Sequence, residues 1–128
     1  MSNIITAVKA GIGKITLNRP EALNALNLSM VRDMTRALLD WQDNPKVEAV
    51  AIRGLSKDGP FGVFCAGGDI RFFHRASIAS DPDLEAFFTE EYRLNHLIFN
   101  YPKPYIAFMD GIVMGGGMGI SQGASLRI

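Results

Sequence analysis

The chain of 128 residues is long enough for one domain with a buried core, and its 48% hydrophobic content argues against disorder. Thirteen basic and thirteen acidic side chains cancel, which argues against a nucleic-acid partner. Cys65 is the only cysteine, so no intrachain disulfide can form and a reducing compartment is expected. No apolar run reaches the roughly 18–20 residues that span a bilayer, and no signal-peptide pattern opens the chain. These features predict a cytoplasmic protein without a membrane partner.

The first predicted element is a β-hairpin. Residues 4–8 and 14–17 are rich in β-branched side chains and are separated by Gly11 and Gly13. Pro20 then ends the second strand, because proline has no backbone N–H to donate to a sheet.

A helix is predicted to follow the hairpin. Residues 21–26 are expected to form a loop or a single helical turn, and Asn27 is the expected N-cap of a helix that extends to about residue 43. Apolar side chains recur along one face of this helix: Met30, Met34, Ala37, Leu38 and Trp41. That face is expected to pack on the core.

The middle of the chain contains the first glycine junction. Residues 47–54 and 61–65 are predicted to be strands. The second strand leads into a short run of mostly small residues: Ala66, Gly67, Gly68, Asp69 and Ile70. Small residues between a strand and a helix leave backbone N–H groups uncovered. Asp69 is equally well explained as the N-cap of the helix that follows.

A long helix is predicted to start at Asp81 and Pro82, as its N-cap and first turn, and to reach about residue 100. At about 100° per residue, its apolar side chains cluster on one face. The members of this face are Leu84, Phe87, Phe88, Leu94 and Ile98.

Glu91 falls near the middle of that apolar face, whereas Glu90 falls at its edge. A carboxylate on an apolar face is unfavourable unless it is paired or takes part in chemistry. Glu91 is therefore either the partner of a buried arginine or of backbone donors, or a functional group. Asn95, one helical turn further on, shares the face and is placed to orient Glu91.

The stretch from Tyr105 to Ile120 begins as an apolar strand and contains three consecutive glycines: Gly115, Gly116 and Gly117. If a helix begins at Gly117, its positive end stabilises negative charge. This arrangement either holds an anion or an oxyanion, or is a tight turn between closely packed elements. The recurrence of strands followed by helices predicts an α/β fold with a partly parallel sheet.

Several common kinds of site are excluded by spacing. His74 and His96 have no metal-ligand spacing to each other or to Cys65, so no metal site is predicted. The glycine-rich stretch fits neither the dinucleotide-binding motif nor the P-loop. Cys65, at an apolar strand position, is expected to be an inert buried thiol rather than a nucleophile.

Taken together, the segments resemble the enoyl-CoA hydratase/isomerase (crotonase) superfamily. The matching segments occur in the family's order over nearly the whole chain: residues 15–26, 64–70, 103–107 and 110–117. Residues 90–95 and 114–121 are most similar to the 3-hydroxyisobutyryl-CoA hydrolase branch. The resemblance implies a crotonase-like (ClpP/crotonase) fold of repeated ββα units. In that fold, residues 1–128 would be the N-terminal part of a single crotonase-like domain, incomplete at its C-terminus.

The resemblance also implies a coenzyme A thioester as substrate. Its carbonyl oxygen would be held by the backbone N–H groups of Gly68 and Gly116, which form an oxyanion hole. Glu91 is implied as a catalytic and substrate-binding carboxylate. Further substrate contacts are implied at Ala22, Ala25, Leu26, Ala66, Gly67, Gly68, Asp69, Ile70, Gly115 and Gly116.

One departure from the family pattern bears on the reaction. Typical hydratases of the family have a catalytic Glu two residues after the triple glycine, and this chain has Gly119 there. Without that carboxylate, the resemblance favours hydrolysis of 3-hydroxyisobutyryl-CoA, as in valine breakdown. The family's remaining catalytic carboxylates lie beyond the equivalent of residue 128, so residues 1–128 alone are expected to be inactive.

The resemblance implies no cofactor, since coenzyme A is part of the substrate, and the superfamily commonly forms trimers. Two alternatives stay open at this stage. One is an enoyl-CoA hydratase or isomerase that acts on another acyl-CoA. The other is a non-catalytic domain that binds coenzyme A.

Overall fold

The computed structural model describes residues 3–22, 24–54, 63–65, 82–108, 112–113, 120 and 126–127. Its elements, in chain order, are β1 (Ile4–Lys9), β2 (Ile12–Leu17), the 3-10 helix η1 (Pro20–Ala22), α1 (Leu28–Gln42), β3 (Ala49–Gly54), β4 (Val63–Cys65), α3 (Asp83–Phe99), β5 (Tyr105–Phe108), β6 (Ile112–Val113) and β7 (Leu126–Arg127). The alternation of strands and helices confirms the predicted α/β class.

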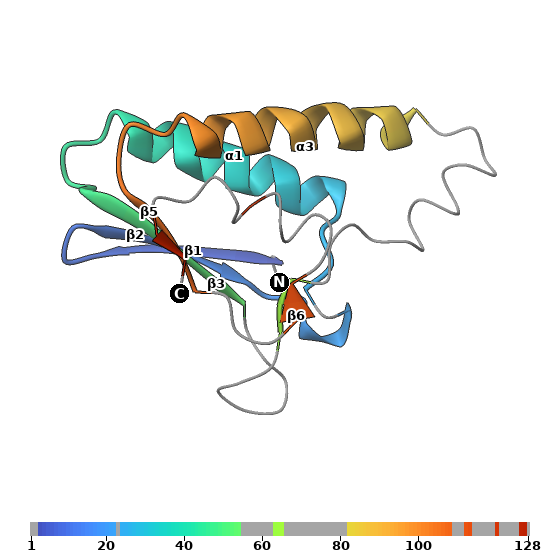
Figure 1. Ribbon diagram of the computed structural model, residues 1–128, viewed down its shortest axis with the longest axis horizontal. Coiled ribbons are helices and arrows are strands. Elements are labelled where there is room, and N and C mark those ends of the chain that lie inside the picture. Colours follow the sequence, from blue (N-terminus) through green and yellow to red (C-terminus); the bar gives the residue numbers. More distant parts are fainter. Residues whose placement is uncertain are drawn as a thin grey trace.

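The largest sheet has five strands in the order β1-β2-β3-β5-β7. β1 and β2 are antiparallel, whereas β2–β3, β3–β5 and β5–β7 are parallel. Both helices cover the same face of this sheet, with α3 as the outermost layer and α1 between α3 and the strands (Figure 1). β4 and β6 form a separate parallel pair.

The hairpin forms as predicted, but its turn is shorter than expected. Ala10 and Gly11 occupy the connection with φ values of 54° and 80°, the left-handed pair that a two-residue hairpin turn requires. Gly13, which was expected in the connection, lies inside β2 and is buried. A Cβ at this position would lie 2.5 Å from Trp41 Cε3. Gly13 is therefore required for close packing of α1 on the sheet.

α1 has the predicted cap and the predicted apolar face. The Asn27 side-chain oxygen accepts a hydrogen bond from the Met30 N–H at 2.9 Å, which satisfies one of the free donors of the first turn. Met30, Met34, Leu38 and Trp41 are all buried. They pack over a fully buried row that crosses three paired strands, Ile15, Ile52 and Ala107.

α3 begins at Asp83, and its N-cap residue is Pro82, which makes no side-chain capping hydrogen bond. The prediction that Pro82 lies in the first turn, with Asp81 as the N-cap, is therefore wrong. Asp81 itself lies outside the described residues. Its buried face consists of Phe87, Leu94 and Ile98. Phe88 was predicted on this face, but that prediction is wrong, because the side chain is 42% exposed. Phe87 is fully buried, and a neighbouring residue points about 100° away around the helix.

The segment between α3 and β5 holds other elements in place. The Tyr101 hydroxyl donates to the Leu38 carbonyl at 2.6 Å, and Lys103 Nζ donates to the carbonyls of Trp41 and Asn44, the latter at 2.7 Å. These donors satisfy carbonyls at and beyond the C-terminal turn of α1, where positive charge is favourable.

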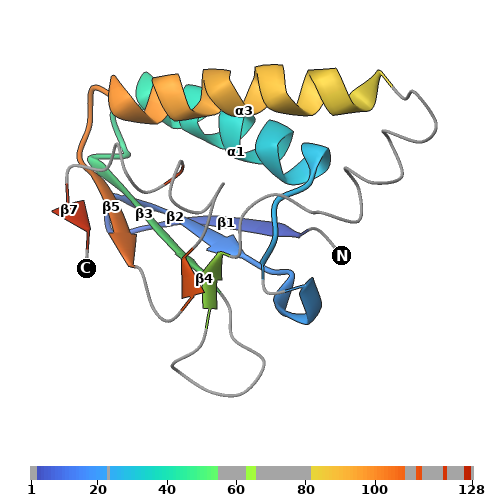
Figure 2. The same ribbon diagram turned by 45° about the vertical axis from the view of Figure 1, so that its right-hand side comes forward.

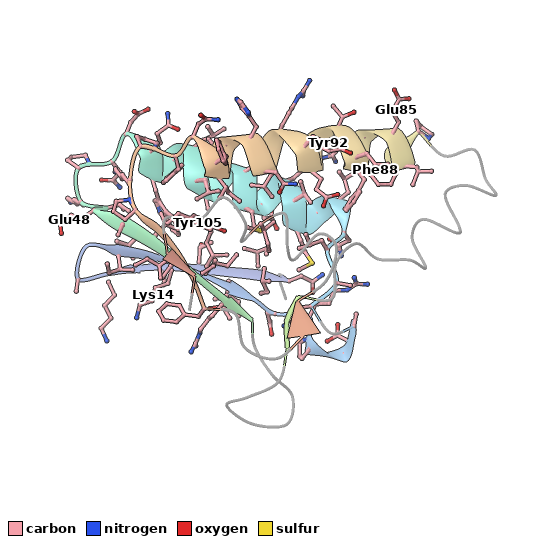
Figure 3. The ribbon with its side chains drawn as sticks, viewed as in Figure 1. Lys14, Glu48, Glu85, Phe88, Tyr92 and Tyr105 are labelled. Atoms are coloured by element: carbon pink, nitrogen blue, oxygen red, sulfur yellow. The ribbon has the colours of Figure 1, made fainter. Side chains whose placement is uncertain are left out.

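Tyr105, the first residue of β5, is 1% exposed and its side chain is directed inward (Figure 3). Its hydroxyl donates to the Ile120 carbonyl at 3.0 Å. Burial raises the pKa of Tyr105 far above its ordinary value, so the hydroxyl stays protonated and remains a donor. No helix in the described ranges combines the length and the apolar character that crossing a bilayer requires.

Candidate active site

The β4–β6 pair brings together two chain segments that are distant in sequence. Val63 pairs with Ile112 and Cys65 pairs with Val113, with an irregularity between the two pairs. The two strands lie side by side in both views (Figures 1 and 2). Because they are parallel, the chain leaves both strands at the same edge.

This register relates the two predicted oxyanion donors. Gly68 follows Cys65 by three residues, and Gly116 follows the paired Val113 by three residues. The glycines themselves, together with Ala66, Gly67, Asp69, Ile70 and Gly115, lie outside the described residues.

The loop before α1 is closed by a buried asparagine. Asn24 is completely buried and has a φ of 55°. Its side-chain oxygen accepts a hydrogen bond from the Arg19 N–H at 2.9 Å, and its own N–H donates to the Arg19 carbonyl at 2.8 Å. Arg19 Nη1 also donates to the Ala25 carbonyl at 3.0 Å. These hydrogen bonds of Asn24 and Arg19 fix the path of the loop.

The three predicted contact residues of this loop differ in accessibility. Ala22 is partly exposed, Ala25 is 8% exposed, and Leu26 is fully buried in the core. Ala22 therefore offers the most surface to a ligand on this side of the site.

The two adjacent carboxylates of α3 lie in different environments. Arg32 on α1 donates from Nε and Nη2 to the two oxygens of Glu90, at 2.9 and 3.0 Å. These hydrogen bonds, together with the positive charges of Arg32 and Arg93, lower the pKa of Glu90. Glu90 is thus an ionised structural partner. Sequence patterns gave no signal for Arg32, because the pair joins residues that are 58 positions apart.

Glu91 is only partly exposed, and burial raises its pKa above the ordinary value of 4.5. It lies between Phe87 and Leu94 on the half of α3 that faces the core, as the sequence predicted. Asn95 lies one turn further on, and its Oδ1 is buried without a hydrogen-bond partner. The two side chains form no hydrogen bond with each other in the part of the chain that the structure describes, so the predicted orientation of Glu91 by Asn95 is not seen.

Other potential sites are sparse. Within the described residues, no group of three or more His, Cys, Asp or Glu side chains is arranged to hold a metal ion. A shallow depression runs along the N-terminal half of α3. It is lined by Pro82, Glu85, Ala86, Thr89, Glu90 and Arg93, and none of the predicted site residues is among them.

The chain is similar in sequence and in fold to known proteins. A family model described as enoyl-CoA hydratase/isomerase matches residues 12–128. The chain is 49% identical over 121 residues to the mitochondrial 3-hydroxyisobutyryl-CoA hydrolase of Xenopus tropicalis, covering 94% of this chain and 30% of that protein. It is 40% identical over 125 residues to the human protein of the same name, covering 98% of this chain and 31% of that protein.

Solved structures agree with this fold. A carnitinyl-CoA dehydratase from Mycobacterium thermoresistibile matches with a TM-score of 0.92 at 40% identity, over 99% of this chain and 36% of that chain. An enoyl-CoA hydratase from Rhodobacter sphaeroides matches with a TM-score of 0.90 at 40% identity, over 98% of this chain and 36% of that chain. The predicted crotonase-like fold is confirmed. This chain spans about a third of the length of these proteins.

The names of the relatives correct one prediction. The hydrolases from Xenopus tropicalis and human are both named as mitochondrial proteins, so the expectation of a cytoplasmic address is overturned. That expectation was based on a single cysteine and on the absence of a signal-peptide pattern. Neither feature discriminates between one reducing compartment and another.

Proposed function

Because this chain belongs to the enoyl-CoA hydratase/isomerase family, we propose that it contributes an oxyanion hole and a carboxylate to the hydrolysis of an acyl-CoA thioester. The proposed substrate is 3-hydroxyisobutyryl-CoA, and the proposed role is in valine degradation. Relatives at 40–49% identity bear the name of this hydrolase. Coenzyme A enters as part of the substrate, and no separate cofactor is proposed.

The observation that supports this chemistry best is the register of β4 and β6. In this register Cys65 and Val113 are paired, and Gly68 and Gly116 each follow one of these two residues by three positions. When water attacks a thioester carbonyl, negative charge develops on the carbonyl oxygen. Two fixed N–H donors stabilise that charge, and loss of one such donor typically lowers the rate by ~10²–10³.

Glu91 is proposed as the carboxylate on the opposite side of the substrate. Its partial burial raises its pKa, so it exchanges a proton more readily near neutral pH than an ordinary glutamate does. Its neighbour Glu90 is occupied by Arg32 and is not available for this role. The loop that contains Ala22 and Ala25 is proposed to contact the coenzyme A moiety, with Ala66 to Ile70 on its other side.

The functional protein is proposed to be longer than residues 1–128. Residues 1–128 would form the N-terminal part of a single crotonase-like domain, and the missing part would supply the remaining acid–base carboxylates. A homo-oligomer of the trimer type is part of the same proposal. Light scattering of the full-length protein would measure its mass directly.

A second candidate function follows from the solved structures, two of which, at 40% identity, are named as a dehydratase and a hydratase. The full-length protein should therefore be assayed on two substrates, 3-hydroxyisobutyryl-CoA for hydrolysis and crotonyl-CoA for hydration. We expect release of free coenzyme A from the first and little turnover of the second. The reverse pattern would establish a hydratase, and binding without turnover of either substrate would establish a non-catalytic domain.

A further inference from the structure

One side of α3, next to its buried face, contains exposed aromatic residues. Phe88, Tyr92 and Phe99 are 42%, 74% and 73% exposed. Together with Asn95 they recur at intervals of four, three and four residues, which places all four on one stripe of the helix. Phe88 and Tyr92 are seen on neighbouring turns in Figure 3. We call these four residues the outer seam.

The outer seam lies beside the contact with α1. Phe87, Leu94 and Ile98 are buried and belong to the same core cluster as the buried residues of α1. Phe88, Asn95 and Phe99 each follow one of these residues directly in the chain and therefore point about 100° further around the helix. α1 cannot cover both stripes. Isolated domains rarely expose neighbouring aromatic side chains, and such patches mark interaction sites.

Asn95 provides an independent second observation. Its Oδ1 is buried, and within the described part of the chain it accepts no hydrogen bond. A buried acceptor without a donor is unfavourable. A single polar side chain within an apolar helical stripe is also a known means of fixing the register between two helices. The outer seam therefore has apolar side chains that nothing covers and an acceptor, Asn95 Oδ1, that has no hydrogen-bond donor among the described residues.

We propose that the outer seam is the docking face for an apolar helix from the part of the full-length polypeptide outside residues 1–128, and that this helix donates a hydrogen bond to Asn95 Oδ1. The fraction of each relative that this chain covers supports this choice of docking partner. The chain covers 30% of the Xenopus tropicalis hydrolase and 36% of the Mycobacterium thermoresistibile dehydratase. The larger part of each of those proteins is therefore available to cover this face. A second copy of the chain is the competing occupant.

The first test introduces a charge into the seam of the full-length protein. Tyr92→Asp and Phe99→Asp are compared with Leu39→Asp, because Leu39 is also a large exposed apolar residue, at 51%, but lies on α1. We expect the two seam variants to lower the unfolding temperature and the control to leave it unchanged, with no change in molecular mass by light scattering. Equal unfolding temperatures for all three would overturn the proposal. A fall in mass for the seam variants would identify a second copy as the occupant and would also overturn it.

The donor is tested by Asn95→Leu. If the docked helix donates to Asn95, leucine leaves that donor unpaired and lowers the stability of the full-length protein. If no donor is present, leucine removes a buried unpaired acceptor, and the stability stays the same or rises. A rise would overturn the hydrogen bond to Asn95.

Two cysteine variants keep the proposal testable if the charged variants do not fold. Tyr92→Cys and Thr89→Cys place a thiol on the seam and on the exposed side of the same helix. In the full-length protein we expect a small thiol reagent to label the cysteine at 92 at least about tenfold more slowly than the one at 89, because labelling requires the docked helix to open. Equal labelling rates would show that the seam is open to solvent, contrary to the proposal.

Discussion

Arg32 and Glu90 join the two helices through a two-point contact, with Nε to Oε1 at 2.9 Å and Nη2 to Oε2 at 3.0 Å. A guanidinium and a carboxylate that meet at two points define an orientation as well as a distance. The pair therefore fixes the rotation of α3 relative to α1. Because adjacent helical residues differ by about 100° in direction, it also directs Glu91 away from Arg32.

Glu90→Gln tests the structural role of this pair. Because both side chains are partly exposed, at 52% for Arg32 and 28% for Glu90, we expect a loss of about 0.2–1 kcal/mol in the free energy of unfolding. The difference from the parent should shrink in high salt, where charges are screened. Glu90 has a lowered pKa, so its stabilisation is present above its unfolded pKa and is lost as the pH falls through the folded value. Chemical denaturation at low and high salt measures the effect.

Compared with Glu90→Gln, Glu91→Gln should raise stability rather than lower it, and it should reduce activity much more strongly. The raised pKa of Glu91 means that its stabilising contribution is complete below the unfolded pKa and is lost as the pH rises through the folded pKa. Glutamine is neutral at every pH, so the variant should gain stability relative to the parent as the pH rises above the ordinary glutamate pKa of 4.5. In the full-length protein, thioester hydrolysis should fall far more for Glu91→Gln than for Glu90→Gln. Equal losses would show that Glu91 has no special role.

Gly13→Ala should destabilise the contact between α1 and the sheet. The added Cβ would lie 2.5 Å from Trp41 Cε3, inside the hard contact distance. Overpacking of this kind typically lowers the free energy of unfolding by about 1–3 kcal/mol. The double variant with Trp41→Leu is the control, since a smaller side chain makes room for the methyl group. Additive losses in this double-mutant cycle would rule out a steric cause.

Tyr105→Phe removes the hydroxyl that binds the Ile120 carbonyl at 3.0 Å. Loss of one such hydrogen bond typically costs about 0.5–1.5 kcal/mol. Ser29→Ala is the control, because it removes a hydroxyl from an exposed residue. Thermal unfolding should separate the two variants. The same unfolding temperature for both would mean that the bond to Ile120 contributes nothing.

Asn24→Ala should loosen the loop before α1. It removes the side-chain acceptor for the Arg19 N–H and places alanine at a φ of 55°, which together predict a loss of about 1–3 kcal/mol. In the full-length protein, KM for the acyl-CoA should rise. Asn27→Ala, which removes only the cap of α1, should lower stability by ~1 kcal/mol without changing KM. A change in KM for both variants would argue against a specific role of the loop.

Much of the local structure could be predicted from the sequence because its causes are local. The hairpin and α1 are specified by nearby residues, such as the Asn27 cap and the apolar stripe from Met30 to Trp41. The packing of Gly13 under Trp41, the pairing of Arg32 with Glu90 and the exposure of Phe88 depend on residues far away in the chain. A helical wheel fixes spacing, but it does not say which of two neighbouring stripes meets the core.

The candidate site could likewise be predicted only in part. The family pattern named Gly68, Gly116 and Glu91, and the burial of Glu91 followed from its place on the wheel. The pairing of β4 with β6 could not be predicted, because two- and three-residue strands contain too little pattern to select a partner. The buried state of Leu26 was also missed, since a family motif does not distinguish a residue that contacts a ligand from one that supports the loop.

The segment from Tyr101 to Lys103 has a consequence for how the chain is made. Its side chains bind carbonyls at the C-terminal end of α1 from 63 and 62 positions further along the sequence. A ribosome synthesises α1 long before it synthesises these donors. Until residue 103 has left the exit tunnel, the end of α1 lacks these side-chain donors. It then has only the local backbone bonds from Asp43 and Asn44 to the Trp41 carbonyl, and it frays as an isolated helix does. A helix that lies early in the sequence is thus completed late in synthesis.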